Sequence, residues 1–135
     1  MIVIGLGRFG ASTAGQLDRQ DREVLVVDTD MQLVQKWADR VTHAVQADAR
    51  SMEALRQIGA EQFQIAVVAT GASIEASVLI AANLVDLGIP QIWAKAISQS
   101  HGKILERIGV NHVIYPEREA GERVAHLLSG SMLDF

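Results

Sequence analysis

The feature that most constrains the fold of this chain is a glycine pattern placed directly after a short apolar run. Residues 2–4 are Ile-Val-Ile, and residues 5–10 follow as Gly-Leu-Gly-Arg-Phe-Gly. A second apolar run, residues 24–27, ends at Asp28. A G-x-G-x-x-G segment between a strand and a helix, with an acid about 20 residues later, is typical of adenine nucleotide sites. The pattern therefore predicts a nucleotide-binding βαβ unit at the start of the chain.

The three glycines and the acid have separate expected roles. Gly5 permits the tight turn after the strand, Gly7 leaves room for a pyrophosphate, and Gly10 lets the first helix pack closely on the strand. The N-terminus of that helix directs free N–H groups and the positive end of its dipole toward the phosphates. Asp28 would accept hydrogen bonds from ribose hydroxyls, and its charge disfavours the 2′-phosphate of NADP.

The composition agrees with one α/β domain. The 135 residues are 49% hydrophobic but only 4% aromatic, so the core consists mainly of aliphatic side chains. Such a core is typical of a parallel sheet covered by helices on both faces. The net charge of −4 argues against a nucleic-acid partner. Because the chain has no cysteine, disulfides, zinc–thiolate sites and thiol nucleophiles are excluded.

The chain also carries no sign of membrane insertion or export. No apolar run reaches the roughly 20 residues that span a bilayer. No signal peptide precedes the first strand. We therefore expect a cytoplasmic location without direct membrane insertion.

Short apolar runs alternate with amphipathic segments along the whole chain. The predicted strands are residues 2–4, 24–28, 43–46, 65–69, 91–94 and 110–114. The predicted helices are residues 8–19, a segment with Leu33 and Trp37, and residues 52–58, 74–87, 100–108 and 117–129. Six strands alternating with six helices predict an α/β, Rossmann-like, doubly wound parallel sheet of order 3-2-1-4-5-6. A ligand would bind at the C-terminal ends of strands 1 and 4, where the order reverses.

Other positions at this predicted sheet edge have two interpretations each. Arg8 would neutralise a terminal phosphate, or it is a solvated arginine of the first helical turn. Asp48 would reach the adenine amino group, or it caps the following helix. Lys95 would contact a phosphate or an acidic partner, or it lies on the surface. The backbone of residues 69–72 is expected to pass close to the ligand.

The chain offers no set of residues that resembles a catalytic site. It has no nucleophile elbow, no Walker A lysine motif and no paired His and Asp, and the six-stranded unit leaves no residues for a substrate domain. The four histidines lie in separate predicted elements without metal-ligand spacing. We therefore expect no enzyme activity and no resident metal. The alternatives are the cofactor half of an NAD-dependent oxidoreductase and an NAD redox sensor outside ion transport.

The last predicted helix carries an apolar stripe. Ala120, Val124, Leu127 and Leu128 follow the spacing i, i+4, i+7 and i+8. The stripe either packs back onto the sixth strand or forms an interface with another chain. We favour an oligomer interface, because the predicted sheet is already covered on both faces.

Several stretches match a known family almost from end to end. They are residues 5–10, 42–45, 71–72 with 76–77, 89–96, 105–109, and 116–117 with 121. In these stretches the chain resembles the RCK domain (regulator of K+ conductance, also called the TrkA N-terminal domain), and within it the KtrA-type subunits of bacterial Ktr potassium transporters. The arginine inside the glycine loop and the Ile-Trp-x-Lys-Ala stretch at residues 92–96 are more specific than the glycines alone.

The resemblance implies a regulator of potassium transport. Residues 1–135 would form the RCK N-terminal domain, with residues 117–135 as a crossover helix and tail used in oligomerisation and with the family's C-terminal ligand lobe absent. Dimers would assemble into a ring beneath a membrane K+-translocating subunit of the KtrB or TrkH type, at the inner face of the cell membrane. Exchange of ATP for ADP would change the shape of the ring and gate transport. NADH and NAD are the alternative ligands, since Asp28 suits any free ribose.

The resemblance also assigns roles by position. Arg8 would sense the γ-phosphate, often across a dimer interface, and Asp28 would bind the ribose. Glu117 would lie near the phosphates of paired nucleotides, where a cation is held. Asp30 departs from the family pattern, in which asparagine stands, and the extra acid would alter the ribose contacts. The expected nucleotide site comprises Gly5, Gly7, Arg8, Phe9, Gly10, Asp28, Thr29, Asp30, Asp48, Ala49, Thr70, Gly71, Ala72, Lys95 and Glu117.

Overall fold

Six parallel strands form the centre of the computed structural model, which describes residues 1–70 and 73–133. The strands are β1 (Ile2–Ile4), β2 (Leu25–Asp28), β3 (His43–Gln46), β4 (Ile65–Val68), β5 (Gln91–Lys95) and β6 (His112–Ile114). The helices are α1 (Arg8–Arg19), α2 (Met31–Trp37), α3 (Met52–Gln57), α4 (Ile74–Asp86), α5 (Gln99–Ile108) and α6 (Pro116–Leu133), with a short 3-10 turn, η1 (Ala60–Gln62). The sheet order is β3-β2-β1-β4-β5-β6, so the predicted topology is confirmed.

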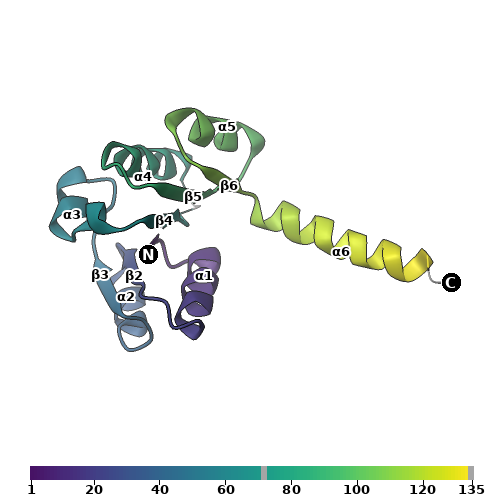
Figure 1. Cartoon of the computed structure of the whole chain (residues 1–135), viewed down its shortest axis with the longest axis horizontal. Coiled ribbons are helices and arrows are strands. Elements are labelled where there is room, and N and C mark those ends of the chain that lie inside the picture. The colour runs from purple at the N-terminus through teal and green to yellow at the C-terminus, as the bar shows by residue number, and fades with distance from the viewer. Residues whose placement is uncertain (71–72, 134–135) are drawn as a thin grey trace.

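Helices cover both faces of the sheet, because successive side chains of a strand point to opposite sides. Val3 of β1 packs in a core with Ala14 of α1 and Trp37 of α2. Ile2 and Ile4 pack in the other core, which α3, α4 and α5 complete. Figure 1 shows α1 and α2 below the sheet and α4 and α5 above it. The predicted two-sided aliphatic core is therefore present.

Local signals fix where the elements begin and end. The side chains of Ser73 and Ser98 cap α4 and α5. Gly59 and Gly109 follow α3 and α5 closely and adopt left-handed φ angles of 74° and 113°, as is common for glycines that end helices. The strands β2 and β6 begin later than predicted, and side chains supply some of the hydrogen bonds at their starts. The Asn111 amide oxygen, for example, accepts an N–H from β5 at 2.6 Å.

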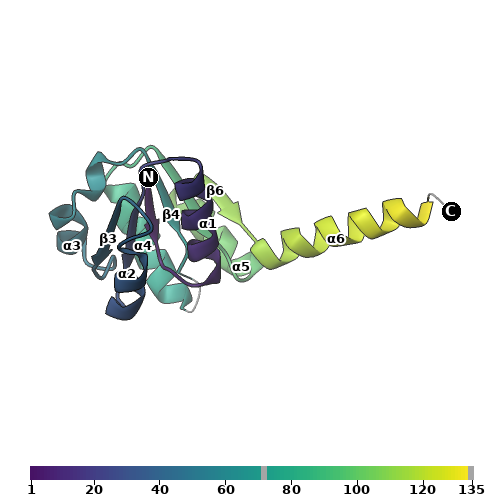
Figure 2. The same cartoon turned by 90° about the horizontal axis from the view of Figure 1, so that it is seen from below.

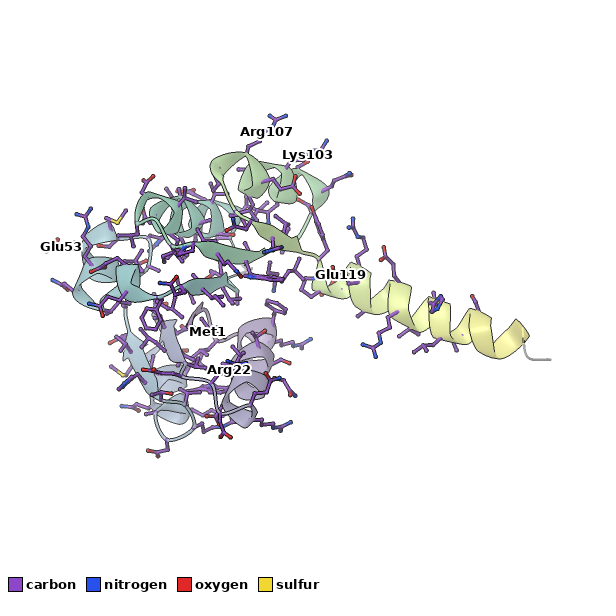
Figure 3. The ribbon with its side chains drawn as sticks, viewed as in Figure 1. Met1, Arg22, Glu53, Lys103, Arg107 and Glu119 are labelled. Carbon is purple, nitrogen blue, oxygen red and sulfur yellow. The ribbon has the colours of Figure 1, made fainter. Side chains whose placement is uncertain are left out.

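The helix α6 leaves the rest of the fold as a separate rod (Figures 1 and 2). It begins at Pro116 and is longer than the predicted residues 117–129. Val124 and Leu128 are 54% and 60% exposed, so the apolar stripe does not pack back onto β6. Figure 3 places Glu119 at the base of the rod, whose side chains radiate outward. Within the described residues, no helix is apolar enough over a sufficient length to cross a bilayer.

One buried polar pair interrupts the aliphatic core. Among the described side chains, Ser77 of α4 and His101 of α5 are the buried polar ones, at 0% and 1% exposure. His101 Nε2 lies 3.0 Å from the Ser77 hydroxyl, and His101 Nδ1 lies 3.1 Å from the Ile97 nitrogen. A backbone N–H can only donate, so Nδ1 accepts and the ring proton resides on Nε2. Burial lowers the pKa of His101.

This lowered pKa predicts a stability that depends on pH. The unfolded chain takes up a proton at this histidine near pH 6.5, whereas the folded chain takes it up only at lower pH. The pair's contribution is therefore complete above about pH 6.5 and is lost as the pH falls below it. We expect the free energy of unfolding of the wild type to decrease more steeply between about pH 7 and pH 5 than that of His101→Asn. Urea unfolding measures both, and parallel pH profiles would contradict the assignment.

The close approach of α1 to β1 gives a second prediction. A Cβ on Gly10 would overlap the Gly5 carbonyl oxygen, so backbone atoms must move in Gly10→Ala. We expect this variant to lose about 3 kcal/mol of unfolding free energy. Gly15→Ala in the same helix is the matched control, because its new methyl would lie 3.7 Å from Trp37 and alanine favours helix by about 1 kcal/mol. Equal urea midpoints for Gly10→Ala and Gly15→Ala would refute the close approach of Gly10 to Gly5.

Candidate nucleotide-binding site

A first hollow lies at the C-terminal ends of β1, β2 and β4, where the strand order reverses. Its volume is about 190 Å³. It is lined by Ile4, Gly5, Val27, Asp28, Thr29, Ala47, Asp48, Ala49, Arg50, Thr70, Ala76 and Ile80. This is the position at which doubly wound folds bind their ligands.

Asp28 ties the glycine loop to the end of β2. Its Oδ2 accepts the Leu6 N–H at 2.7 Å, and its Oδ1 accepts the Asp30 N–H at 2.9 Å. The Gly5 N–H also donates to the Val27 carbonyl at 2.8 Å. A carboxylate has about four acceptor positions, so Asp28 keeps capacity for ribose hydroxyls while it holds the loop. Asp28 thus has a structural function, and its contact with a ribose stays a prediction.

Asp48 faces the first hollow but does not cap a helix. Its carboxylate forms an ion pair with the guanidinium of Arg50, with Oδ2 and Nη2 2.8 Å apart. It also accepts a hydrogen bond from the backbone N–H of Arg50 at 3.0 Å. These bonds from the Arg50 side chain and backbone lower the pKa of Asp48. Ser51 caps α3 instead, by accepting the Ala54 N–H at 3.2 Å. The capping interpretation of Asp48 is wrong, and its contact with a ligand stays a prediction.

A second, larger hollow of about 590 Å³ lies beside the glycine loop. Its lining is Arg8, Phe9, Lys95, Ala96, Ile97, Ser98, Gln99, Tyr115, Pro116, Glu117 and Arg118. The helices α1, α5 and α6 all begin at this hollow, so three positive dipole ends lie near it. Among the described lining residues, three are cationic and Glu117 is the carboxylate. The hollow therefore favours an anionic group.

The structure divides the predicted site between the two hollows. The first receives Gly5, Asp28, Thr29, Asp48, Ala49 and Thr70, and the second receives Arg8, Phe9, Lys95 and Glu117. Gly7 precedes α1 with open space where a side chain would stand, as a close phosphate requires. Gly10 packs on Gly5 instead of lining either hollow. The predicted Gly71 and Ala72 lie outside the described residues.

Asp30 lies outside both hollows. Its side chain accepts the Gln32 N–H at 2.9 Å and caps α2. Asp30 and Gln32 are both exposed to solvent. The expectation that this extra acid alters ribose contacts therefore receives no support from its position, and its backbone N–H acts instead by fixing Asp28.

The surroundings of Glu117 do not fit a bare cation in a single chain. Hard cations such as Mg²⁺ and Ca²⁺ prefer several oxygen ligands. Here one carboxylate shares its hollow with Arg8, Lys95 and Arg118. Among the described residues, no three His, Asp or Glu side chains form a cluster suited to a metal ion.

Sequence reasoning missed several lining residues. Arg50 follows Asp48 by two residues, and that spacing signals the observed ion pair. Ser98 precedes α5 as its cap, a signal that the sequence offers as a serine before an amphipathic segment. Tyr115 and Arg118 flank the predicted Glu117, and the Arg118 guanidinium stacks 4.2 Å from the Tyr115 ring centre. The sequence alone gives no sign that these residues meet Arg8 across one hollow.

Comparison with known proteins places this geometry in a family. The family model described as the TrkA-N domain matches residues 1–116. Ktr system potassium uptake protein A of Bacillus subtilis (strain 168) is 44% identical over 127 residues, which are 94% of this chain and 57% of that relative. Ktr system potassium uptake protein C of the same organism is 38% identical over 134 residues, 98% of this chain and 61% of that relative. The chain thus spans about three fifths of the length of these relatives.

Solved structures share the fold. The TrkA-N domain of the inner membrane protein ybaL from Escherichia coli has a TM-score of 0.84 at 22% identity and covers 94% of both chains. The GsuK channel bound to NAD has a TM-score of 0.71 at 14% identity, over 84% of this chain and 20% of that one. GsuK bound to ADP has a TM-score of 0.70 at 14% identity, over 84% and 30%. The resemblance seen in the sequence is therefore confirmed, and the chain belongs to the TrkA-N domain family.

Proposed function

We propose that this chain is the nucleotide-sensing domain of a cytosolic regulatory subunit that controls a bacterial membrane K+ transporter. The names of its relatives, Ktr system potassium uptake proteins A and C, support the link to potassium uptake. The domain itself binds the nucleotide, and no catalytic step is required of it. The activity resides in the response of an assembly to the bound ligand.

The observation that carries the proposal is the pair of hollows on either side of the Asp28-held glycine loop. The first hollow offers Asp28 to a ribose and Asp48 to an adenine amino group. The second offers Arg8 and Lys95 to phosphates. An adenine nucleotide that crosses the loop at Gly7 would have its neutral end in the first hollow and its charged end in the second.

ATP and ADP are the proposed ligands, with NAD(H) as the alternative. The cationic lining of the second hollow favours the terminal phosphates of ATP or ADP over a nicotinamide ring. Charge-assisted bonds to an added γ-phosphate are stronger than neutral ones. The fold itself accommodates either ligand class, since GsuK has been solved with NAD and with ADP.

Regulation also requires assembly. We propose that residues 117–135 act as the crossover helix and tail of a homodimer, and that dimers form a ring against a membrane K+-translocating subunit of the KtrB or TrkH type. The exposed apolar residues Val124 and Leu128 support α6 as the dimer element. Nucleotide exchange would shift the ring between two shapes only by the difference in its affinity for them.

The function is tested by calorimetric titration of the 135-residue chain with ATP, ADP, NADH and NADPH, with light scattering on each mixture. We expect ATP and ADP to bind more tightly than NADPH, because Asp28 repels a 2′-phosphate. We also expect the ATP and ADP complexes to differ in size. Tight NADH binding without a response to ATP would contradict ATP sensing and would instead indicate a regulator that senses NADH.

The Arg8→Ala variant tests the terminal phosphate contact. We expect ATP affinity to fall by about tenfold, ADP affinity by less, and adenosine affinity hardly at all, because the lost bond is charge-assisted. Arg19→Ala at the other end of α1 is the matched control and should leave all three unchanged. Equal losses for ATP, ADP and AMP in Arg8→Ala would remove this role from Arg8.

The Asp28→Asn variant tests the ribose contact. We expect weaker binding of ATP, ADP and adenosine alike, because the charged acceptor of both the loop and the ribose becomes a neutral amide. Asp30→Asn is the matched control, since asparagine caps a helix as well as aspartate does. Equal titration curves for the two variants would contradict the ribose assignment.

A further inference from the structure

A buried side chain that lines neither hollow joins the helix α4 to the loop between β5 and α5. His101, in the first turn of α5, makes three hydrogen bonds. Its Nδ1 accepts the Ile97 N–H at 3.1 Å, and its own backbone N–H donates to the Ser98 hydroxyl at 3.1 Å. Its Nε2 reaches the Ser77 hydroxyl of α4 at 3.0 Å.

These bonds connect the walls of the two hollows. Ile97 and Ser98 line the second hollow, next to Lys95. Ser77 follows Ala76, which lines the first hollow together with Ile80 of the same helix. The histidine ring is thus the polar link between α4, which borders the first hollow, and the β5–α5 loop, which borders the second.

The same turn of α5 also contacts another residue that lines the second hollow. The Tyr115 hydroxyl lies directly over Gly102, where a Cβ would overlap it. Tyr115 lines the second hollow and precedes Pro116, at which α6 begins. Residues 101 and 102 therefore contact both the loop that follows Lys95 and Tyr115, and both segments line the second hollow.

Core stability alone does not account for this pair. A satisfied buried hydrogen bond adds little net stability, and a pair of apolar side chains of similar shape can replace it at little cost. The pair does fix how the loop and the helix lie relative to the ring. One ring nitrogen accepts and the other donates, so each partner fits at only one side of the ring. The pair is buried next to residues 95–99 and 115–118, the segments of the second hollow that carry Lys95 and Arg118. It is therefore suited to fixing the conformation of the β5–α5 loop.

We propose that His101 is a positioning residue of the nucleotide site: oriented by Ser77, it holds the β5–α5 loop so that Ile97 and Ser98, which follow Lys95, border the charged end of the ligand. This inference rests on the proposed function and deepens it, since it names what preorganises the phosphate side of the site. His101 itself does not touch the ligand.

The test compares His101→Leu with His101→Asn in the 135-residue chain. Leucine removes both ring contacts, whereas asparagine keeps an acceptor near the position of Nδ1 for the Ile97 N–H. We expect His101→Leu to weaken ATP binding by about fivefold and adenosine binding by less than about twofold. We expect His101→Asn to retain most of the wild-type ratio of the two affinities.

Hydrogen exchange at the Ile97 amide is the second readout. It should quicken in His101→Leu and stay slow in His101→Asn, with or without nucleotide. If His101→Leu does not fold, Ser77→Ala replaces it, because this variant removes one hydroxyl and should still lower the ATP-to-adenosine affinity ratio by about twofold.

If His101→Leu or Ser77→Ala leaves the ratio of ATP affinity to adenosine affinity unchanged, this inference is overturned and the proposed function still stands. Restoration of ATP binding by asparagine together with restored protection of Ile97 supports it. A wild-type chain that binds neither ATP nor adenosine overturns the proposed function, and this inference with it.

Discussion

The carboxylate of Asp28 is the interaction on which the arrangement of this edge depends. It accepts one N–H from the glycine loop after β1 and one from the turn before α2. The acid acts together with the Gly5 N–H bond to Val27, the buried side chain of Leu6 and the packing of Gly10 on Gly5. Removing the acid would release the loop, the start of α1 and the position of Arg8 together.

The two hollows differ in charge because different elements build them. Strand ends and the acids that follow them line the first, with Asp28 and Asp48 in place. Helix starts line the second, and their unpaired N–H groups add to the positive side chains. A ligand with a ribose at one end and phosphates at the other matches this separation. The same chain segment, the glycine loop, forms the border between them.

The sequence was sufficient for the fold and for part of the site. The period of the strands, Gly59 and Gly109, and the distance from Gly5 to Asp28 are local signals, and the structure follows them. Asp48 is ambiguous in the sequence because an acid before a helix has two uses. The structure gives the cap of α3 to Ser51 and pairs Asp48 with Arg50, an ion pair that neither use includes. The contact between His101 and Ser77 spans 24 residues and two helices, so no local pattern announces it. The isolation of α6 likewise depends on what the rest of the fold leaves uncovered.

The position of α6 gives the molecule a mechanical property. An 18-residue helix is about 27 Å long, and this one joins the rest of the fold at its first turn and extends away from it. That turn, at Pro116, is part of the wall of the second hollow. A tilt of about 10° at the base would carry the tip through roughly 5 Å, by simple leverage on a rod of that length. A small rotation at the second hollow would thus become a displacement as wide as a side chain at the far end of α6.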